Sequence, residues 1–183
     1  MTALEIAANA VTTVSIGLAA RNSIHTWWTG IAGAVLFAAL FRSNQLYADV
    51  LLQAFFIATS VIGWVRWTGH GSGIALPVTR SGPGLLAAAI IAGTAATFTY
   101  GAILHRFTDA YAPFWDSLVL AFSVIAQLLL LNRKRETWHF WLLVNTVAVP
   151  LYCSRGLWLT GLLYAAYWVN AAIALRVWRR LSL

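Results

Sequence analysis

Charged residues are scarce in this sequence, and their scarcity excludes most soluble proteins. Only 9% of the 183 residues are charged, whereas a soluble globular domain has about 25%. A disordered chain is excluded because 61% of the residues are hydrophobic. A disulfide scaffold is excluded because Cys153 is the only cysteine. The composition therefore indicates an integral membrane protein.

Acidic residues are fewer still, 5 against 12 basic ones, so the net charge is +7. A role in binding nucleic acid does not follow, because the basic residues lie singly or in short clusters between apolar runs. In a membrane protein such clusters set the orientation. With seven spans, all basic residues except Arg42, Arg106 and Arg155 fall on one side. We therefore expect an external N-terminus and a cytoplasmic C-terminus.

Seven apolar runs predict seven transmembrane helices. The runs are continuously apolar, whereas strands of a membrane barrel alternate apolar with polar residues. One long connection, at residues 68–83, is rich in glycine and indicates an exposed loop. The predicted spans are residues 3–20, 27–41, 46–65, 84–104, 114–131, 137–153 and 157–177.

The sequence repeats itself at a spacing of 111 residues. When the chain is shifted by that distance, the first three spans fall on the last three without a gap. Trp27 and Trp67 then fall on Trp138 and Trp178. Chance accounts for many of the leucine and alanine matches but not easily for the tryptophan pairs. The repeat therefore predicts two copies of one three-helix unit.

One extra span between the copies determines their orientation. A three-helix unit begins and ends on opposite sides of the membrane, so the span at residues 84–104 makes the two copies parallel. We expect an all-α membrane protein with seven transmembrane helices in a 3+1+3 arrangement. The first repeat would be residues 1–67, a cytoplasmic loop and linker helix 68–111, and the second repeat with a cytoplasmic tail 112–183. Solute transporters use such plans; channels, membrane scaffolds and seven-span receptors remain alternatives.

Amide side chains inside the spans are the first candidates for a site. An amide in hydrocarbon is costly unless it has a partner or lines a wet cavity. Each one is therefore either a contact between helices, worth about 0.6 kcal/mol, or part of a site. The candidates are Gln53, Gln127, Asn145 and Asn170, with Asn9 a weaker fifth.

Three of these amides share a helical face with aromatic residues. In the sixth span the residues follow the spacing i, i+3, i+7, and in the seventh span the spacing i, i+3, i+6. Each spacing places its set of residues on one face of the helix. In the third span, Gln53 and Phe56 occupy the positions that match Tyr164 and Tyr167 in the repeat. The sets are Trp138, Trp141 and Asn145 in the sixth span and Tyr164, Tyr167 and Asn170 in the seventh.

Such rings and amides suit a flat heterocycle that carries a carboxamide or a ribose. Aromatic faces stack on neutral rings and attract cationic ones. Most of the other tryptophans lie near span ends, where an aromatic belt at the lipid headgroups explains them. These residues are Trp27, Trp28, Trp67, Trp115, Trp158 and Trp178.

Other functional groups are missing from the spans. No carboxylate or lysine lies at mid-span, where a proton or sodium relay usually has one. The four histidines lack metal-ligand spacing. We therefore expect no metal site, no cofactor and no enzymatic activity, and a solute that moves down its own gradient. An alternative from another functional class is a non-transporting membrane subunit or receptor. In such a protein the amides would hydrogen-bond to one another.

Several segments resemble the PnuC vitamin transporter family. The likeness covers nearly the whole chain and is weakest at residues 68–104. The segments are LYADVLLQ at 46–53, GWVRW at 63–67, FWD at 114–116, the pair Trp138 and Trp141, GLWLT at 156–160 and WRR at 178–180.

The resemblance implies a SWEET-like 3+1+3 fold, a homotrimer in the bacterial cytoplasmic membrane, and facilitated diffusion of a vitamin. Most members of the family carry nicotinamide riboside, which a separate cytoplasmic kinase then traps by phosphorylation. Thiamine and riboflavin are the alternative substrates. The family's site at the membrane midplane corresponds here to Gln53, Trp138, Trp141, Asn145, Tyr164, Tyr167 and Asn170.

Overall fold

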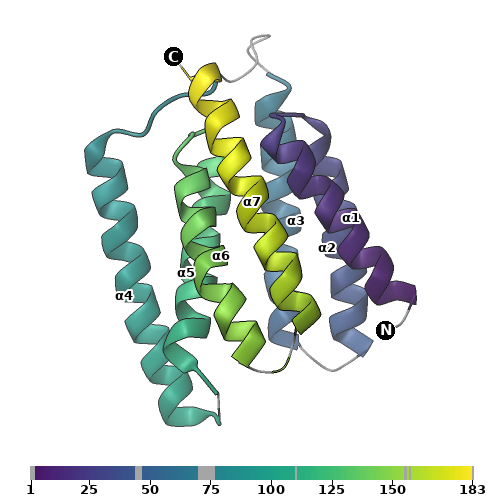
Figure 1. Cartoon of the computed structure of the whole chain (residues 1–183), viewed down its shortest axis with the longest axis vertical. Coiled ribbons are helices and arrows are strands. Elements are labelled where there is room, and N and C mark those ends of the chain that lie inside the picture. Colours follow the sequence, from purple (N-terminus) through teal and green to yellow (C-terminus); the bar gives the residue numbers. More distant parts are fainter. Residues whose placement is uncertain are drawn as a thin grey trace. The chain divides into compact units, whose positions relative to one another are not determined.

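The computed structural model describes residues 3–43, 47–69, 77–109, 111–154, 156 and 158–182, which form seven α-helices (Figure 1). The only bridged backbone outside helices in these ranges joins Thr79 to Lys134. Each predicted span coincides with a helix, although residues 46 and 157, where two spans were expected to begin, lie outside the described residues. The helices are α1 (Ala3–Ala20), α2 (His25–Ser43), α3 (Tyr47–Trp67), α4 (Pro83–Phe107), α5 (Pro113–Leu131), α6 (Thr137–Ser154) and α7 (Trp158–Leu181).

Several helices extend beyond the apolar runs that predicted them, and the added turns are polar. Arg42 lies in the last turn of α2, and Arg179 and Arg180 lie in the last turn of α7. A basic side chain at a helix C-terminus is favoured by the helix dipole. Pro83 opens α4, where the missing N–H would have had no partner in any case. Hydropathy does not detect these turns.

Three helices, α1, α4 and α5, are long and apolar enough to cross a bilayer by length and composition. In α7, arginines near the C-terminal end lower the hydropathy of the helix. Polar residues are interspersed in α2, α3 and α6. The described helices thus include three strongly apolar spans, and the crossing of all seven stays a prediction.

The chain forms two compact units. The first comprises Met1–Pro77 and Leu131–Arg133, and the second comprises Val78–Leu130 and Lys134–Leu183. In the first unit, α1 packs on α2 and α2 packs on α3; in the second, α6 packs on α7. The predicted division into two repeats and a linker stays a prediction.

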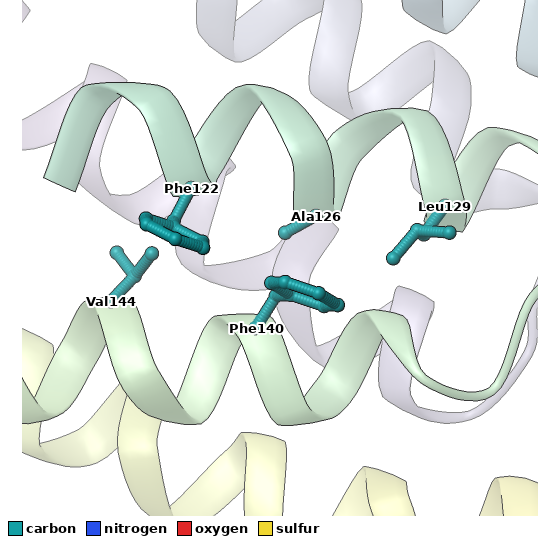
Figure 2. Packing of buried hydrophobic residues seen from close by; sticks show 5 residues of the cluster. All are labelled: Phe122, Ala126, Leu129, Phe140 and Val144. Atoms are coloured by element: carbon teal, nitrogen blue, oxygen red, sulfur yellow. The ribbon is translucent and has the colours of Figure 1, made fainter. Parts of the chain in front are cut away.

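The core of the second unit lies between α5 and α6. Figure 2 shows Phe122, Ala126 and Leu129 facing Phe140 and Val144 of the neighbouring helix. The rings of Phe122 and Phe140 stack with centroids 5.9 Å apart and an interplanar angle of 18°. This close packing fixes the position of α6 against α5.

One side-chain hydrogen bond recurs at the spacing of 111 residues. In the first unit, Thr26 Oγ1 donates to the backbone carbonyl of Ser15 at 2.9 Å. In the second, Thr137 Oγ1 donates to the carbonyl of Ala126 at 2.7 Å. Each bond joins the start of one helix to the helix before it, so equivalent sequence positions make equivalent contacts.

The turns that precede these threonines are also alike. Asn22 and Arg133 both have left-handed backbone conformations, with φ of 56° and 51°. The N–H groups of Ser23 and Lys134 each donate at 2.9 Å to the carbonyl five residues earlier. These bonds satisfy carbonyls that the end of the preceding helix leaves free.

Two edge-on tryptophan pairs occupy equivalent places. Trp27 meets Trp67 with ring centroids 5.1 Å apart, and Trp138 meets Trp178 at 5.6 Å. All four rings are buried, so the prediction of a headgroup belt is wrong for Trp27, Trp67 and Trp178. These side chains face neighbouring helices, a direction that their place near a span end does not reveal. The remaining predicted belt residues are exposed, as a belt requires: Trp28, Trp115 and Trp158.

Candidate functional site

Three predicted site residues on α6 differ in burial. Trp138 and Asn145 are 2% and 3% exposed. Trp141 is only partly buried, where it packs against the core between α5 and α6. Their spacing places all three along one side of the helix. Because part of Trp141 is accessible, it is the ring on this face that a ligand can contact directly.

Trp138 is enclosed by protein. One side of its ring is covered by the edge-on contact with Trp178. Its indole Nε1 is buried and has no hydrogen-bond partner among the described residues. In this structure Trp138 therefore joins α6 to α7, and its ring is less accessible than that of Trp141.

Three tyrosines form a ring cluster between α6 and α7. Tyr164 lies between Tyr152, at a centroid distance of 5.0 Å, and Tyr167, at 5.8 Å. Tyr152 was not among the predicted site residues. It follows Asn145 by seven residues, so the same helical spacing would have identified it. The cluster adds a third hydroxyl-bearing ring beside the two that the sequence predicted.

The region around Asn170 is held by a hydrogen bond between α6 and α7. Trp168 Nε1 donates to Thr146 Oγ1 at 3.0 Å, and that hydroxyl donates to the carbonyl of Leu142 at 2.7 Å. Thr146 follows Asn145 directly, and Asn170 lies two residues after Trp168. The bond therefore fixes the neighbouring parts of the two helices that carry candidate amides.

The predicted site residues of the first unit lie on α3. Gln53 is 8% exposed, and Phe56 is partly buried and meets Phe55 edge-on at 5.6 Å. Thr59 and Ser60 on the same helix are also buried. Thr59 Oγ1 lies 2.9 and 3.1 Å from the carbonyls of Phe55 and Phe56. This part of α3 thus buries three polar side chains.

Two of the candidate amides are buried, because Gln53 and Asn145 are 8% and 3% exposed. Asn9, in contrast, is only partly buried and donates from Nδ2 to the carbonyl of Glu5 at 2.9 Å, which is a local contact within α1. A buried amide is costly unless its polar atoms are hydrogen-bonded, so Gln53 and Asn145 stay the stronger candidates for contact with a polar ligand.

Glu136 anchors the start of α6, and the sequence analysis missed it. Its Oε2 accepts a hydrogen bond from the backbone N–H of Ser81 at 2.8 Å, and its Oε1 pairs with Nε of Arg135 at 3.0 Å. Burial raises the pKa of this carboxyl, but the hydrogen bonds outweigh burial, so the pKa lies below its ordinary value. The charged carboxylate holds the segment before α4 against the start of α6.

The described residues form no metal centre. Within the described ranges, no group of three or more His, Cys, Asp or Glu side chains could hold a metal ion. Cys153 is free, and its Sγ lies against Gly161 on α7. The predicted site residues on α6 and α7 supply aromatic rings, amides and hydroxyls, which can stack on a ligand and hydrogen-bond to it.

Known proteins resemble the chain in sequence and in fold. The family model described as nicotinamide mononucleotide transporter matches residues 2–180. The nicotinamide riboside transporter PnuC of Escherichia coli (strain K12) is 27% identical over 190 residues, covering 89% of this chain and 79% of that protein. The riboflavin/roseoflavin transporter RibM of Streptomyces davaonensis is 26% identical, covering 95% and 83%. A crystal structure of the vitamin B3 transporter PnuC has a similar fold, with a TM-score of 0.76 and 20% identity over 97% of this chain and 81% of that chain.

Proposed function

The chain belongs to the nicotinamide mononucleotide transporter family, and from this premise we propose that it carries nicotinamide riboside across the membrane by facilitated diffusion. The family consists of transporters and not of enzymes. The observation that carries the proposal is on α6, where the accessible ring of Trp141 lies about one helical turn from the buried Asn145 amide. A flat cationic ring can stack on the indole while its carboxamide bonds to the amide.

The proposal keeps all the predicted site residues as substrate contacts and adds Tyr152. Rings supply stacking surface, while amides and tyrosine hydroxyls supply hydrogen bonds to a ribose or a carboxamide. The burial of Gln53 and Asn145 supports this role, because polar side chains inside membrane proteins commonly mark a solute pathway. The proposed contacts are Gln53, Phe56, Trp138, Trp141, Asn145, Tyr152, Tyr164, Tyr167 and Asn170.

Riboflavin is the second candidate substrate. The sequence is similar to relatives that are named for nicotinamide riboside and for riboflavin, at 27% and 26% identity. The accessible ring of Trp141, about one helical turn from the Asn145 amide, suits the one ring and the carboxamide of nicotinamide riboside. The three fused rings of riboflavin need a longer stacking surface, which the tyrosine cluster would have to provide. Thiamine, the third candidate, has a cationic ring but no carboxamide.

Facilitated diffusion fits the distribution of acidic residues. All five acidic residues of the sequence lie at or near helix ends, so no mid-helix carboxylate is available to couple transport to protons or sodium. In this proposal the chain is a 3+1+3 protein of the bacterial cytoplasmic membrane, with an external N-terminus, and assembles as a homotrimer. Net uptake then depends on a separate cytoplasmic kinase that phosphorylates the vitamin.

Thermal unfolding of the purified protein with each vitamin tests the proposal. A ligand raises the melting temperature according to its affinity for the folded state. We expect nicotinamide riboside to give the largest shift, with riboflavin and thiamine smaller or without effect. A larger shift with riboflavin would indicate that riboflavin, the second candidate, is the substrate. No shift with any of the three would contradict a vitamin site.

A further inference from the structure

One face of α7 is exposed along most of the helix. Its apolar members include Leu162, Val169 and Ile173, each of which is more than half exposed. Successive members are three or four residues apart, which keeps them on one side of the helix. We call this face the α7 stripe, and its exposed residues are Leu162, Ala166, Val169, Ile173, Arg176 and Arg180.

The α7 stripe is apolar over most of its length and basic at its C-terminal end. At a rise of about 1.5 Å per residue, its apolar part from Leu162 to Ile173 is about 16 Å long. This length is roughly half of a hydrocarbon core about 30 Å thick. Arg176 follows Ile173 within one helical turn. The apolar part therefore matches one leaflet of a bilayer, and the arginines follow where its headgroups begin.

The corresponding helix of the first sequence copy lacks these arginines. The matching tryptophan pairs fix the register between α3 and α7, so that Arg176 falls on Val65 and Arg180 falls on Gly69. Val65 is itself half exposed. A copy of the three-helix unit thus forms without arginine at these two positions, which indicates that the arginines serve something other than the fold.

The same end of the second unit carries further positive charge. Nη1 of Arg135 donates to Ser182 Oγ at 3.1 Å, and the Lys134 ammonium donates to Thr79 Oγ1 at 2.8 Å. Glu136 is the acidic residue of this end, and its carboxylate is already paired with Arg135. This end therefore attracts anions. Its basic residues are Arg80, Lys134, Arg135, Arg176, Arg179 and Arg180.

A second copy of the chain does not supply the missing negative charge. A copy inserted in the same direction brings the same basic residues to this level, and its Glu136 is paired in the same way. The other acidic residues of the sequence lie on the side predicted to be external. They are Glu5, Asp49, Asp109 and Asp116.

We infer that the α7 stripe binds an anionic phospholipid. The phosphate lies at Arg176 and Arg180, because a guanidinium group donates paired hydrogen bonds to phosphate oxygens. An acyl chain lies along Ile173, Val169 and Leu162. A free phosphate would satisfy the arginines alone, whereas a lipid matches both parts of the stripe. None of these residues is a proposed vitamin contact, so the lipid site stands apart from the transport site.

Binding of two lipids that differ only in headgroup charge tests this site. Native mass spectrometry of the protein in dodecyl maltoside measures the affinity for phosphatidylglycerol and for phosphatidylcholine with the same acyl chains. We expect phosphatidylglycerol to bind more tightly. Arg176→Gln with Arg180→Gln should weaken its binding by about tenfold or more, and Arg176→Lys with Arg180→Lys should retain most of it because the charge remains. The matched control, Arg42→Gln with Arg106→Gln, removes the same charge from exposed arginines of other helices and should leave the affinity unchanged.

Three results would overturn the lipid site. The first is equal affinity for the two lipids. The second is an equal loss of phosphatidylglycerol binding in the Arg42 and Arg106 control, because total charge would then decide the affinity. The third is displacement of phosphatidylglycerol by an equal concentration of glycerol 3-phosphate, which would show that the phosphate alone is recognised. Vitamin binding enters none of these measurements, so their failure would leave the proposed function standing.

Discussion

Trp138 packs edge-on against Trp178, with the two ring centroids 5.6 Å apart and an interplanar angle of 78°. Trp178 is completely enclosed. The contact joins the start of α6 to the end of α7, two helices that carry proposed substrate contacts. The ring of Trp178, which the sequence predicted to lie in a headgroup belt, therefore stabilises the second unit from within.

Removal of this contact should destabilise the second unit. Trp178→Ala leaves a large cavity beside Trp138, and we expect a loss of about 3–5 kcal/mol in the free energy of unfolding. Denaturation of the protein in detergent measures the loss. Trp158→Ala is the matched control, because that ring is 70% exposed and its removal should change stability by about 0.5 kcal/mol or less. Equal losses for the two variants would show that Trp178 is not packed as described.

Gly63 is required by the ring of Trp27. A β-carbon at position 63 would lie 2.6 Å from atoms of that ring, whereas a β-carbon at Gly17 would meet nothing within 4 Å. Both glycines lie inside helices, where alanine is intrinsically preferred by about 1 kcal/mol. We expect Gly63→Ala to lower the melting temperature by overpacking and Gly17→Ala to raise it. Shifts of the same sign in one assay would contradict this packing.

The proposed substrate contacts on α6 should affect ligand affinity more than folding. Trp141→Ala removes the accessible stacking surface, and Asn145→Ala removes the buried amide. Each should weaken nicotinamide riboside binding by about tenfold or more, as measured by calorimetry. Leu143→Ala on the same helix is the control, because Leu143 is exposed and should leave affinity unchanged. Wild-type affinity in both test variants would remove the proposed site.

Glu136 should make the start of α6 sensitive to acid. Its pKa in the folded protein lies below the ordinary value of 4.5, so its contribution to stability is present above that value. The contribution is lost as the pH falls through the lower, folded-state pKa. Hydrogen exchange at the Ser81 amide should therefore lose protection at acidic pH. The Glu136→Gln variant should lack this pH dependence, and the amide of Asn22, bonded to the Ala19 carbonyl, serves as the control within the chain.

An unchanged protection factor at Ser81 between neutral and acidic pH would contradict the role of Glu136. The same conclusion would follow if Glu136→Gln and the unmodified protein responded alike. Loss of protection at Asn22 in parallel with Ser81 would indicate general acid unfolding instead of a local change.

The helices could be predicted from the sequence because continuous apolar runs directly specify membrane-length helices. Their polar ends could not, since turns such as the one with Arg179 and Arg180 depend on the helix dipole and on local contacts. The burial of Trp27 and Trp178 was also missed. Position along a span says how deep a ring lies in the bilayer, but only packing between helices says which way it points.

The site could be predicted from the sequence where its residues lie on one helix. The spacing of Trp138, Trp141 and Asn145 is a helical period, and the same period extends to Tyr152. Contacts between residues far apart in the sequence produce no such periodic pattern. Glu136 meets Ser81 across 55 residues, and a charged residue in a short loop ordinarily indicates only a solvated surface.

Vitamin entry into proteoliposomes that contain no kinase tests the central claim most directly. The account predicts that nicotinamide riboside enters until its internal concentration equals the external one. A proton or sodium gradient should leave that end point unchanged, because no mid-helix carboxylate is present to couple the ion. Accumulation above the external concentration, or entry no faster than into protein-free liposomes, would contradict the account.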